Sequence, residues 1–214
     1  MKIVKHIDLG TCDYKKTWEF QKKLRDQKYL ENTDDYLITV EHPPVYTLGR
    51  NGKPEHILIN KDEMTARGIS YYETDRGGDI TFHGPGQLVV YPIFNLNNYY
   101  KDVHRFLREL EQTVIDMLAK FSITAGRVAE YTGVWVNDRK ICAIGINVSR
   151  WITMHGLALN VNNDLSYFRN IIPCGIVNKD ITSMKEELGT DVDITEVKKS
   201  LLRSFSETFG IVLQ

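Results

Sequence analysis

The stretch GVWVNDRKICAIGINV, residues 133–148, decides the fold class. Two runs rich in valine and isoleucine, 133–136 and 140–148, flank Asn137 and Asp138, which suit a tight turn. The pattern predicts a β-hairpin of two antiparallel strands. Runs of the same kind lie on both sides of it and predict four more strands, at Tyr36–Val40, Ile69–Glu73, Leu88–Phe94 and Gly156–Val161.

Three other stretches repeat apolar side chains every three or four residues, which indicates amphipathic helices. They cover Asp13–Tyr29, Asp102–Phe121 and the segment from Asp193, which forms a capping-box pattern with Glu196, to a stop signal at Gly210. Helices and strands do not alternate regularly, which disfavours a barrel or a doubly wound sheet. We therefore predict an α+β fold, with a mixed, mainly antiparallel sheet flanked by helices.

The composition is that of an ordinary globular protein, with 42% hydrophobic and 26% charged residues in 214. Because neither a repeat nor a low-complexity linker interrupts it, we expect one domain over residues 1–214, with at most a small C-terminal subdomain after about Ile181. Lys and Arg total 27 and Asp and Glu total 28, a net charge of -1. No overall charge therefore draws the chain to nucleic acid or to an anionic membrane.

The cysteines and the apolar runs indicate in which cellular compartment the protein is expected. Cys12, Cys142 and Cys174 are three widely separated residues, which predicts neither a disulfide framework nor a zinc clip and favours a reducing compartment. The N-terminus does not look like an export signal, and the longest apolar run, Leu88–Phe94, contains a proline. We expect a cytoplasmic protein without a membrane span. The six histidines show no metal-ligand spacing, so we expect no metal site.

The segment RGGDITFHGPGQ, residues 76–87, is the densest anomaly, because four glycines and a proline surround Arg76, His83 and Gln87. One interpretation is a glycine-rich turn between two strands. It is not a dinucleotide fingerprint, because its spacing is not GxGxxG and no helix pattern begins right after it, and it is not a Walker A loop, because no GKS or GKT closes it. The other interpretation is a backbone cradle that holds a polar carbonyl or phosphate beside an apolar group.

Two residues are considered for catalytic roles. Cys174 lies in the sequence PCG, residues 173–175, and a cysteine between proline and glycine favours an accessible turn over a buried core position. It is the best nucleophile candidate, whereas Cys142, inside an alternating strand, is more typical of a core residue. Lys140 begins that strand, where a lysine is ordinarily a solvated edge charge.

Four motifs occur in order along the chain: RGGDITFHGPGQ at 76–87, RKICAIG at 139–145, HGLALNV at 155–161 and PCG at 173–175. Together with HPPVYTLGR at 42–50, they resemble the octanoyl-[acyl carrier protein]:protein N-octanoyltransferase family of lipoate biosynthesis. The resemblance covers roughly His42 to Met184. Phe82 stands where the family usually has tyrosine, and Cys142 where a small residue is common.

The resemblance implies a fold like that of the biotin and lipoate protein ligase catalytic domains. It implies that Cys174 is the acyl-thioester nucleophile and that Lys140 activates it. It also implies three segments as walls of the acyl site: Arg76, Gly77, Gly78, Asp79, Ile80, Thr81, Phe82 and His83; Ala143, Ile144 and Gly145; and Gly156, Leu157 and Ala158.

The reaction implied is transfer of an octanoyl group from octanoyl-acyl carrier protein to a lysine of a lipoyl domain, without a metal, nucleotide or other cofactor. The acceptors would be the lipoyl domains of 2-oxoacid dehydrogenase complexes and the glycine cleavage H protein, and we expect a monomer. Because carrier proteins of this kind are acidic, we expect a local basic docking patch. The candidates are Arg50, Arg76, Arg150 and Arg169, and the alternative is the face with Lys15, Lys16, Lys22 and Lys23.

Three other functions remain open from the sequence. An ATP-dependent lipoate or biotin ligase would share the fold but not the nucleophile. A non-catalytic module would bind lipoyl domains without modifying them. A Cys/His hydrolase would need a histidine partner for Cys174, and no histidine is singled out for that role.

Overall fold

The computed structural model describes residues 2–31, 33–172 and 180–214. In this part of the chain, a nine-stranded mixed sheet has the order β12-β1-β2-β6-β10-β9-β8-β7, with β11 paired to β9. Most neighbours are antiparallel, whereas β1 runs parallel to β2 and β12, and β11 parallel to β9. The strands are β1 (Lys2–Thr11), β2 (Asp35–Glu41), β6 (Gln87–Ile93), β7 (Gly126–Val128), β8 (Tyr131–Val136), β9 (Arg139–Ser149), β10 (Ile152–Asn160), β11 (Asp180–Ile181) and β12 (Ile211–Leu213).

A second, three-stranded sheet has the order β4-β3-β5, in which β3 pairs parallel with β4 and antiparallel with β5. Its strands are β3 (Val45–Leu48), β4 (Ser70–Glu73) and β5 (Ile80–His83). The helices are α1 (Tyr14–Leu30), α2 (Lys61–Ala66), α3 (Val103–Ala119), α4 (Met184–Leu188) and α5 (Ile194–Phe209), and short 3-10 turns are η1 (Pro54–His56), η2 (Leu96–Asn98) and η3 (Leu165–Asn170).

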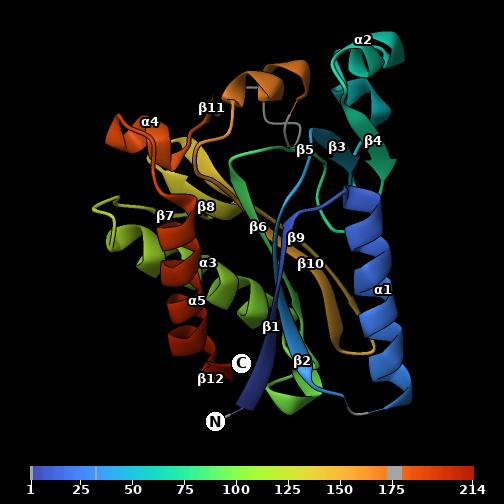
Figure 1. Ribbon diagram of the computed structural model, residues 1–214, viewed down its shortest axis with the longest axis vertical. Coiled ribbons are helices and arrows are strands. Elements are labelled where there is room, and N and C mark those ends of the chain that lie inside the picture. The colour runs from blue at the N-terminus through green and yellow to red at the C-terminus, as the bar shows by residue number, and fades with distance from the viewer. Residues whose placement is uncertain (1, 32, 173–179) are drawn as a thin grey trace.

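The large sheet has helices on both faces: α1 lies on one side, and α3 and α5 pack together on the other (Figure 1). Strand β6 shows why both faces of the sheet are covered, because its side chains point alternately into two hydrophobic clusters. Leu88 and Val90 join the cluster that contains Phe106 of α3, whereas Val89 and Tyr91 join the cluster under α1. The small sheet packs with η3 around a third cluster.

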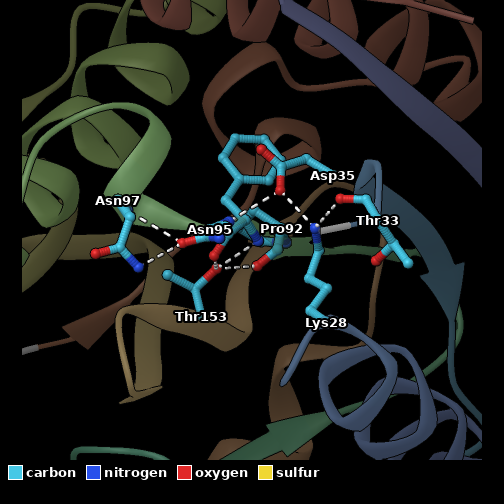
Figure 2. Close-up of polar contacts among 8 residues, drawn as sticks. Lys28, Thr33, Asp35, Pro92, Asn95, Asn97 and Thr153 are labelled. Atoms are coloured by element: carbon cyan, nitrogen blue, oxygen red, sulfur yellow. Dashed lines mark hydrogen bonds and ion pairs between the residues drawn. The ribbon is translucent and has the colours of Figure 1, made fainter. Parts of the chain in front are cut away.

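A buried ion pair fastens the end of α1 to the sheet (Figure 2). Lys28 Nζ lies 2.7 Å from Asp35 Oδ1 and donates to the carbonyl oxygen of Thr33, at 3.0 Å. The same carboxylate oxygen accepts the backbone N–H of Asn95, at 2.9 Å. Both charged side chains are almost fully buried, so this contact joins α1, β2 and the start of η2 without access to water.

The predicted α+β architecture is confirmed, and so is the hairpin, whose turn residue Asn137 has φ 52°. All three predicted helices form. The capping box predicted for the last helix is wrong: the Asp193 side chain accepts the N–H of Thr195, and Glu196 pairs with Lys199. Within the described ranges, no helix has both the length and the apolar character that crossing a bilayer requires.

Candidate functional site

A cavity of about 360 Å³ lies where β6, β9 and β10 of the large sheet face α1 and the small sheet. Ala143, Ile144, Leu157, Ala158 and Val89 give it apolar walls on the large sheet. The glycine-rich segment runs along it, and Lys140 and Ile181 also line it. The structure therefore brings together three segments that lie far apart in the sequence.

Most of the site residues predicted from the sequence line this cavity. They are Arg76, Gly77, Gly78, Asp79, Ile80, Thr81, His83, Lys140, Ala143, Ile144, Gly145, Gly156, Leu157 and Ala158. Phe82 does not line it, because its ring is fully buried in the core of the small sheet, 4.5 Å from the ring of Tyr167. Cys174 lies outside the described residues.

The glycine-rich segment is held by hydrogen bonds rather than left as a loose turn. The Arg76 guanidinium donates to the carbonyl and hydroxyl oxygens of Thr47 and to the carbonyl oxygen of Gly77. Gly77 N–H donates to the carbonyl of Ile146 at 2.8 Å. A Cβ on Gly145 would lie 2.8 Å from the Gly77 carbonyl oxygen, so only glycine allows this close approach. Arg76 therefore organises the cavity wall.

Lys140 lies at the start of β9 opposite Trp135, and only 7% of it is exposed. Its Nζ lies 4.8 Å from the centroid of the Trp135 ring, a distance at which an ammonium is attracted to an aromatic face. Ile181 of β11 is its parallel neighbour. A lysine at a strand end is usually solvated, so this burial distinguishes Lys140 from an ordinary edge charge.

Four rings that the sequence did not single out as a group pack together beside the site, and three of them, Tyr14, His83 and Tyr91, line the cavity. Tyr14 stacks on His83 at 5.8 Å, and His83 lies 5.9 Å from His42. His42 is hydrogen-bonded to the Tyr91 hydroxyl at 2.8 Å. Burial lowers the pKa of His42 to about 4. Burial and the neighbouring His42 ring lower the pKa of His83 to about 3. Both imidazoles are therefore neutral at pH 7.

Another imidazole, His155, lines the cavity from β10 with φ 58°. Its Nε2 lies 2.7 Å from Asp75 Oδ1, and this hydrogen bond lowers the pKa of Asp75 to about 2 against the opposing effect of burial. Burial lowers the pKa of His155 itself. Its Nδ1 has no hydrogen-bond partner among the described residues. A left-handed histidine in a strand is uncommon, and periodicity alone gives no signal for it.

The other two cysteines offer no comparable nucleophile. Cys142 is fully buried in the core, and burial raises the pKa of its thiol. Cys12 is partly exposed just before α1 and is not among the residues that line the cavity. Within the described ranges, no group of three or more histidine, cysteine or acidic side chains is arranged to hold a metal ion.

Comparison with known proteins places these features in context. Residues 13–206 match the model of the lipoyl protein ligase A/B catalytic domain family. The octanoyltransferase of Flavobacterium johnsoniae is 48% identical over 97% of this chain and 97% of its own length. The octanoyltransferase of Thermoanaerobacter sp. is 50% identical over 96% of this chain and 90% of its own length.

Solved structures share the fold at low sequence identity. Lipoate-protein ligase A bound with ATP superposes with a TM-score of 0.81 at 17% identity, over 100% of this chain and 88% of that one. A putative lipoate protein ligase from T. acidophilum with bound lipoic acid gives 0.76 at 18% identity, with coverages of 100% and 88%. Biotin protein ligase from Aquifex aeolicus in complex with biotin and ATP gives 0.58 at 15%, with coverages of 98% and 70%.

Proposed function

The chain belongs to the lipoyl protein ligase A/B catalytic domain family, and we propose that it transfers an octanoyl group from octanoyl-acyl carrier protein to a lysine of lipoyl domains. It is an acyltransferase of protein lipoylation: curated octanoyltransferases are 45% to 51% identical to it over almost its whole length. That identity is the observation that carries the proposal. The cavity and the buried Lys140 supply the chemistry.

The apolar part of the cavity suits a medium-length acyl chain. An octanoyl group has about seven apolar carbons beyond its carbonyl, and burying them contributes on the order of 5 kcal/mol at roughly 0.8 kcal/mol each. Ala143, Gly145 and Ala158 line the cavity without a large side chain that would block it. A short acyl group would lose most of that free energy, so the cavity would bind octanoyl donors in preference to donors with shorter acyl chains.

The first half of the proposed reaction forms an acyl-enzyme. The thiolate of Cys174 attacks the thioester carbonyl, the bond to the carrier sulfur breaks, the departing carrier thiolate takes a proton from a neighbouring ammonium, and octanoyl-Cys174 remains. A free thiol is mostly protonated at pH 7, and a nearby ammonium favours the thiolate. Lys140 is the candidate for that ammonium. Supporting this role, Ile181, which follows the segment containing Cys174 in the sequence, pairs with Lys140 in the sheet.

The second half transfers the acyl group to the acceptor. A lysine amine attacks the octanoyl-Cys174 carbonyl, an amide forms, and the Cys174 thiol leaves. A free lysine is neutral in only about one molecule in 2,500 at pH 7, so a group must take its proton. Lys140 in its neutral form is our candidate base, because its amine is buried beside the cavity rather than solvated.

The partners follow from the same proposal. Lipoyl domains of 2-oxoacid dehydrogenase complexes and the glycine cleavage H protein are the acceptors that we expect, and a solved structural relative is a bipartite archaeal lipoate protein ligase described with its E2 lipoyl domain. We further propose that the enzyme acts as a monomer in the cytoplasm. The nearest alternative is an ATP-dependent ligase, because lipoate-protein ligase A of the same fold binds ATP.

Intact-mass analysis tests the proposal. Incubated with octanoyl-acyl carrier protein and no ATP, the protein should gain one octanoyl group at Cys174 and pass it to an added lipoyl domain. Cys174→Ala should abolish the adduct, whereas Cys12→Ser and Cys142→Ala should retain it. Their side chains lie before α1 and in the core, outside the cavity lining.

The other outcomes separate the rival functions. Modification of the lipoyl domain only with free octanoate and ATP would identify a ligase. Release of octanoate to water in the absence of an acceptor, at the rate of donor consumption, would identify a hydrolase. Tight lipoyl-domain binding without either reaction would identify a non-catalytic module.

A further inference from the structure

The hairpin that carries Lys140 has an irregular register. Val134 pairs with Cys142, but the next residue of β8, Trp135, pairs with Lys140, so Ile141 is an extra residue on β9. This is a β-bulge, which changes the direction of the side chains beside it. As a result, Ile141 and Cys142 both enter the core under α3, while Lys140 lines the cavity.

Gly133 lies directly against the stem of Lys140. Its φ is 130°, a conformation that favours glycine, and a Cβ built on it would lie 2.6 Å from the carbonyl oxygen of Cys142. The same Cβ would lie 3.4 Å from Cε and 3.6 Å from Cδ of Lys140. The position of the Gly133 backbone therefore limits where the lysine side chain can go.

The Gly133 backbone is held in turn by a buried carboxylate on α3. Glu111 is fully buried, and its Oε1 accepts the N–H of Gly133 at 3.1 Å. Its Oε2 accepts hydrogen bonds from Arg108 at 2.7 Å and from Arg127 at 2.9 Å. One oxygen therefore holds the backbone, and the other holds two guanidinium groups.

This division of the two oxygens requires a carboxylate. An amide at position 111 offers one accepting oxygen, so it can satisfy either the arginines or Gly133, and its NH₂ group would face N–H donors on the remaining side. The stronger charge-assisted interaction lies with the arginines. The Gly133 N–H would then lose its acceptor in a buried place, which favours a shift of the backbone.

We propose that Glu111 is a positioning residue for Lys140 and acts through the backbone of Gly133. The inference rests on the proposed function, in which Lys140 is the residue that activates the nucleophile. Trp135 fixes the ammonium end of the side chain, with Nζ 4.8 Å from its ring centroid, and Gly133 fixes the stem. Glu111 is not among the residues that line the cavity, whereas Lys140 is, so Glu111 would act through the geometry of Lys140.

Steady-state and single-turnover kinetics of Glu111→Gln test the proposal. We expect kcat to fall between about 10-fold and 100-fold, because small misplacement of a catalytic group has effects of that size. The KM for octanoyl-acyl carrier protein should change less than about twofold, since the acyl walls are untouched. The rate at which iodoacetamide alkylates Cys174 should fall along with kcat.

Arg108→Met is the matched control. It removes one partner of the same carboxylate and lowers stability, yet it leaves Arg127 and the bond to Gly133 in place, so kcat should stay within about twofold. Gly133→Ala disturbs the backbone that Glu111 holds while leaving Glu111 itself intact, and it should also lower kcat. Thermal unfolding of every variant measures the change in stability separately.

Two results would overturn the inference. One is wild-type kcat in folded Glu111→Gln; the other is an equal loss of kcat in Arg108→Met at a similar melting temperature. Lys140→Met distinguishes this failure from that of the proposed function. If Lys140→Met has the kcat of the wild type, Lys140 does not activate the nucleophile, and the positioning role proposed for Glu111 is also disproved. If it is inactive while Glu111→Gln is active, only the positioning role is lost.

Discussion

The buried residues His42 and His83 are neutral groups next to each other under the first turn of α1. Burial lowers the pKa of each, to about 4 and about 3 respectively, whereas a free histidine titrates near 6.5. The unfolded chain therefore binds more protons than the folded protein below pH 6.5. By linkage, the stability that these groups contribute is complete above pH 6.5 and is lost as the pH falls.

We predict that acid destabilises the protein through these two rings. Each should cost about 2 kcal/mol of unfolding free energy at pH 5 relative to pH 7.5, because its unfolded form is protonated there and its folded form is not. Asp75, with a pKa of about 2, stays charged over this range and adds nothing, whereas His155, whose pKa burial also lowers, adds to the loss in the same direction. His83→Gln should therefore reduce the pH dependence by about 2 kcal/mol. Urea unfolding at the two pH values measures it.

His104→Gln is the control for this prediction, because His104 is exposed on α3. It should leave the pH dependence of unfolding unchanged. If His83→Gln and wild type lose the same free energy between pH 7.5 and pH 5, the titration of His83 does not contribute to acid sensitivity.

At the scale of single residues, sequence reasoning identified candidate residues where motifs are dense and missed features that depend on packing. Lys140 and the glycine-rich segment could be named from the sequence, but the burial of Lys140 could not, because it depends on Trp135 and Ile181. Phe82 was expected in the wall of the acyl site, but its ring packs in the core of the small sheet and does not line the cavity. His155 has a left-handed backbone that no sequence pattern predicts.

Helix α1 depends on the buried pair of Lys28 and Asp35 at its C-terminal end. We predict that Lys28→Met costs about 3–5 kcal/mol of unfolding free energy, because it leaves the Asp35 carboxylate buried without its charged partner. The methionine fills similar space, so the loss would come from charge rather than from a cavity. Chemical denaturation at neutral pH measures the change.

Lys5→Met provides the comparison, since Lys5 pairs with Asp34 at 2.6 Å where both side chains are about half exposed. Its removal should have little measurable effect, because water solvates either partner alone. Equal losses in the two variants would contradict the argument from burial.

At the scale of elements, helices were easier to predict than strands. Helix α3 has a continuous apolar stripe, and its buried residues include Phe106, Leu110 and Val114. Strand β1 was missed because most of its side chains are exposed or half exposed and several are charged. It forms by pairing with β2 and β12, which are distant in sequence. Strand β5 was read as part of a glycine-rich segment, and pairing with β3 makes it a strand.

Across the whole molecule, the near balance of charge leaves docking of an acidic carrier to local patches. Arg76 is not available for that role, because its guanidinium is buried and bound to Thr47 and Gly77. Arg50, Arg150 and Arg169 are exposed and remain candidates. The sequence could not make this distinction, because the burial of an arginine side chain depends on contacts that only the fold provides.

We predict that kcat/KM for octanoyl-acyl carrier protein falls steeply between low salt and about 0.5 M salt, where the Debye length is roughly 4 Å. Octanoyl-pantetheine, which lacks the acidic carrier, should show little change. Arg50→Ala and Arg169→Ala should weaken the salt dependence if they form the patch. An equal salt effect on the two donors would mean that no basic docking surface exists.

The walls of the cavity come from α1, the glycine-rich segment, β9, β10 and β11, whose lining residues run from Tyr14 to Ile181. No short fragment of the chain carries a complete binding site. An acyl group that fills the space therefore holds distant parts of the chain together, and it can bind tightly only to the folded form. A group attached to the protein gains its burial free energy only in the folded form, so the enzyme should resist proteolysis best while it carries its acyl group.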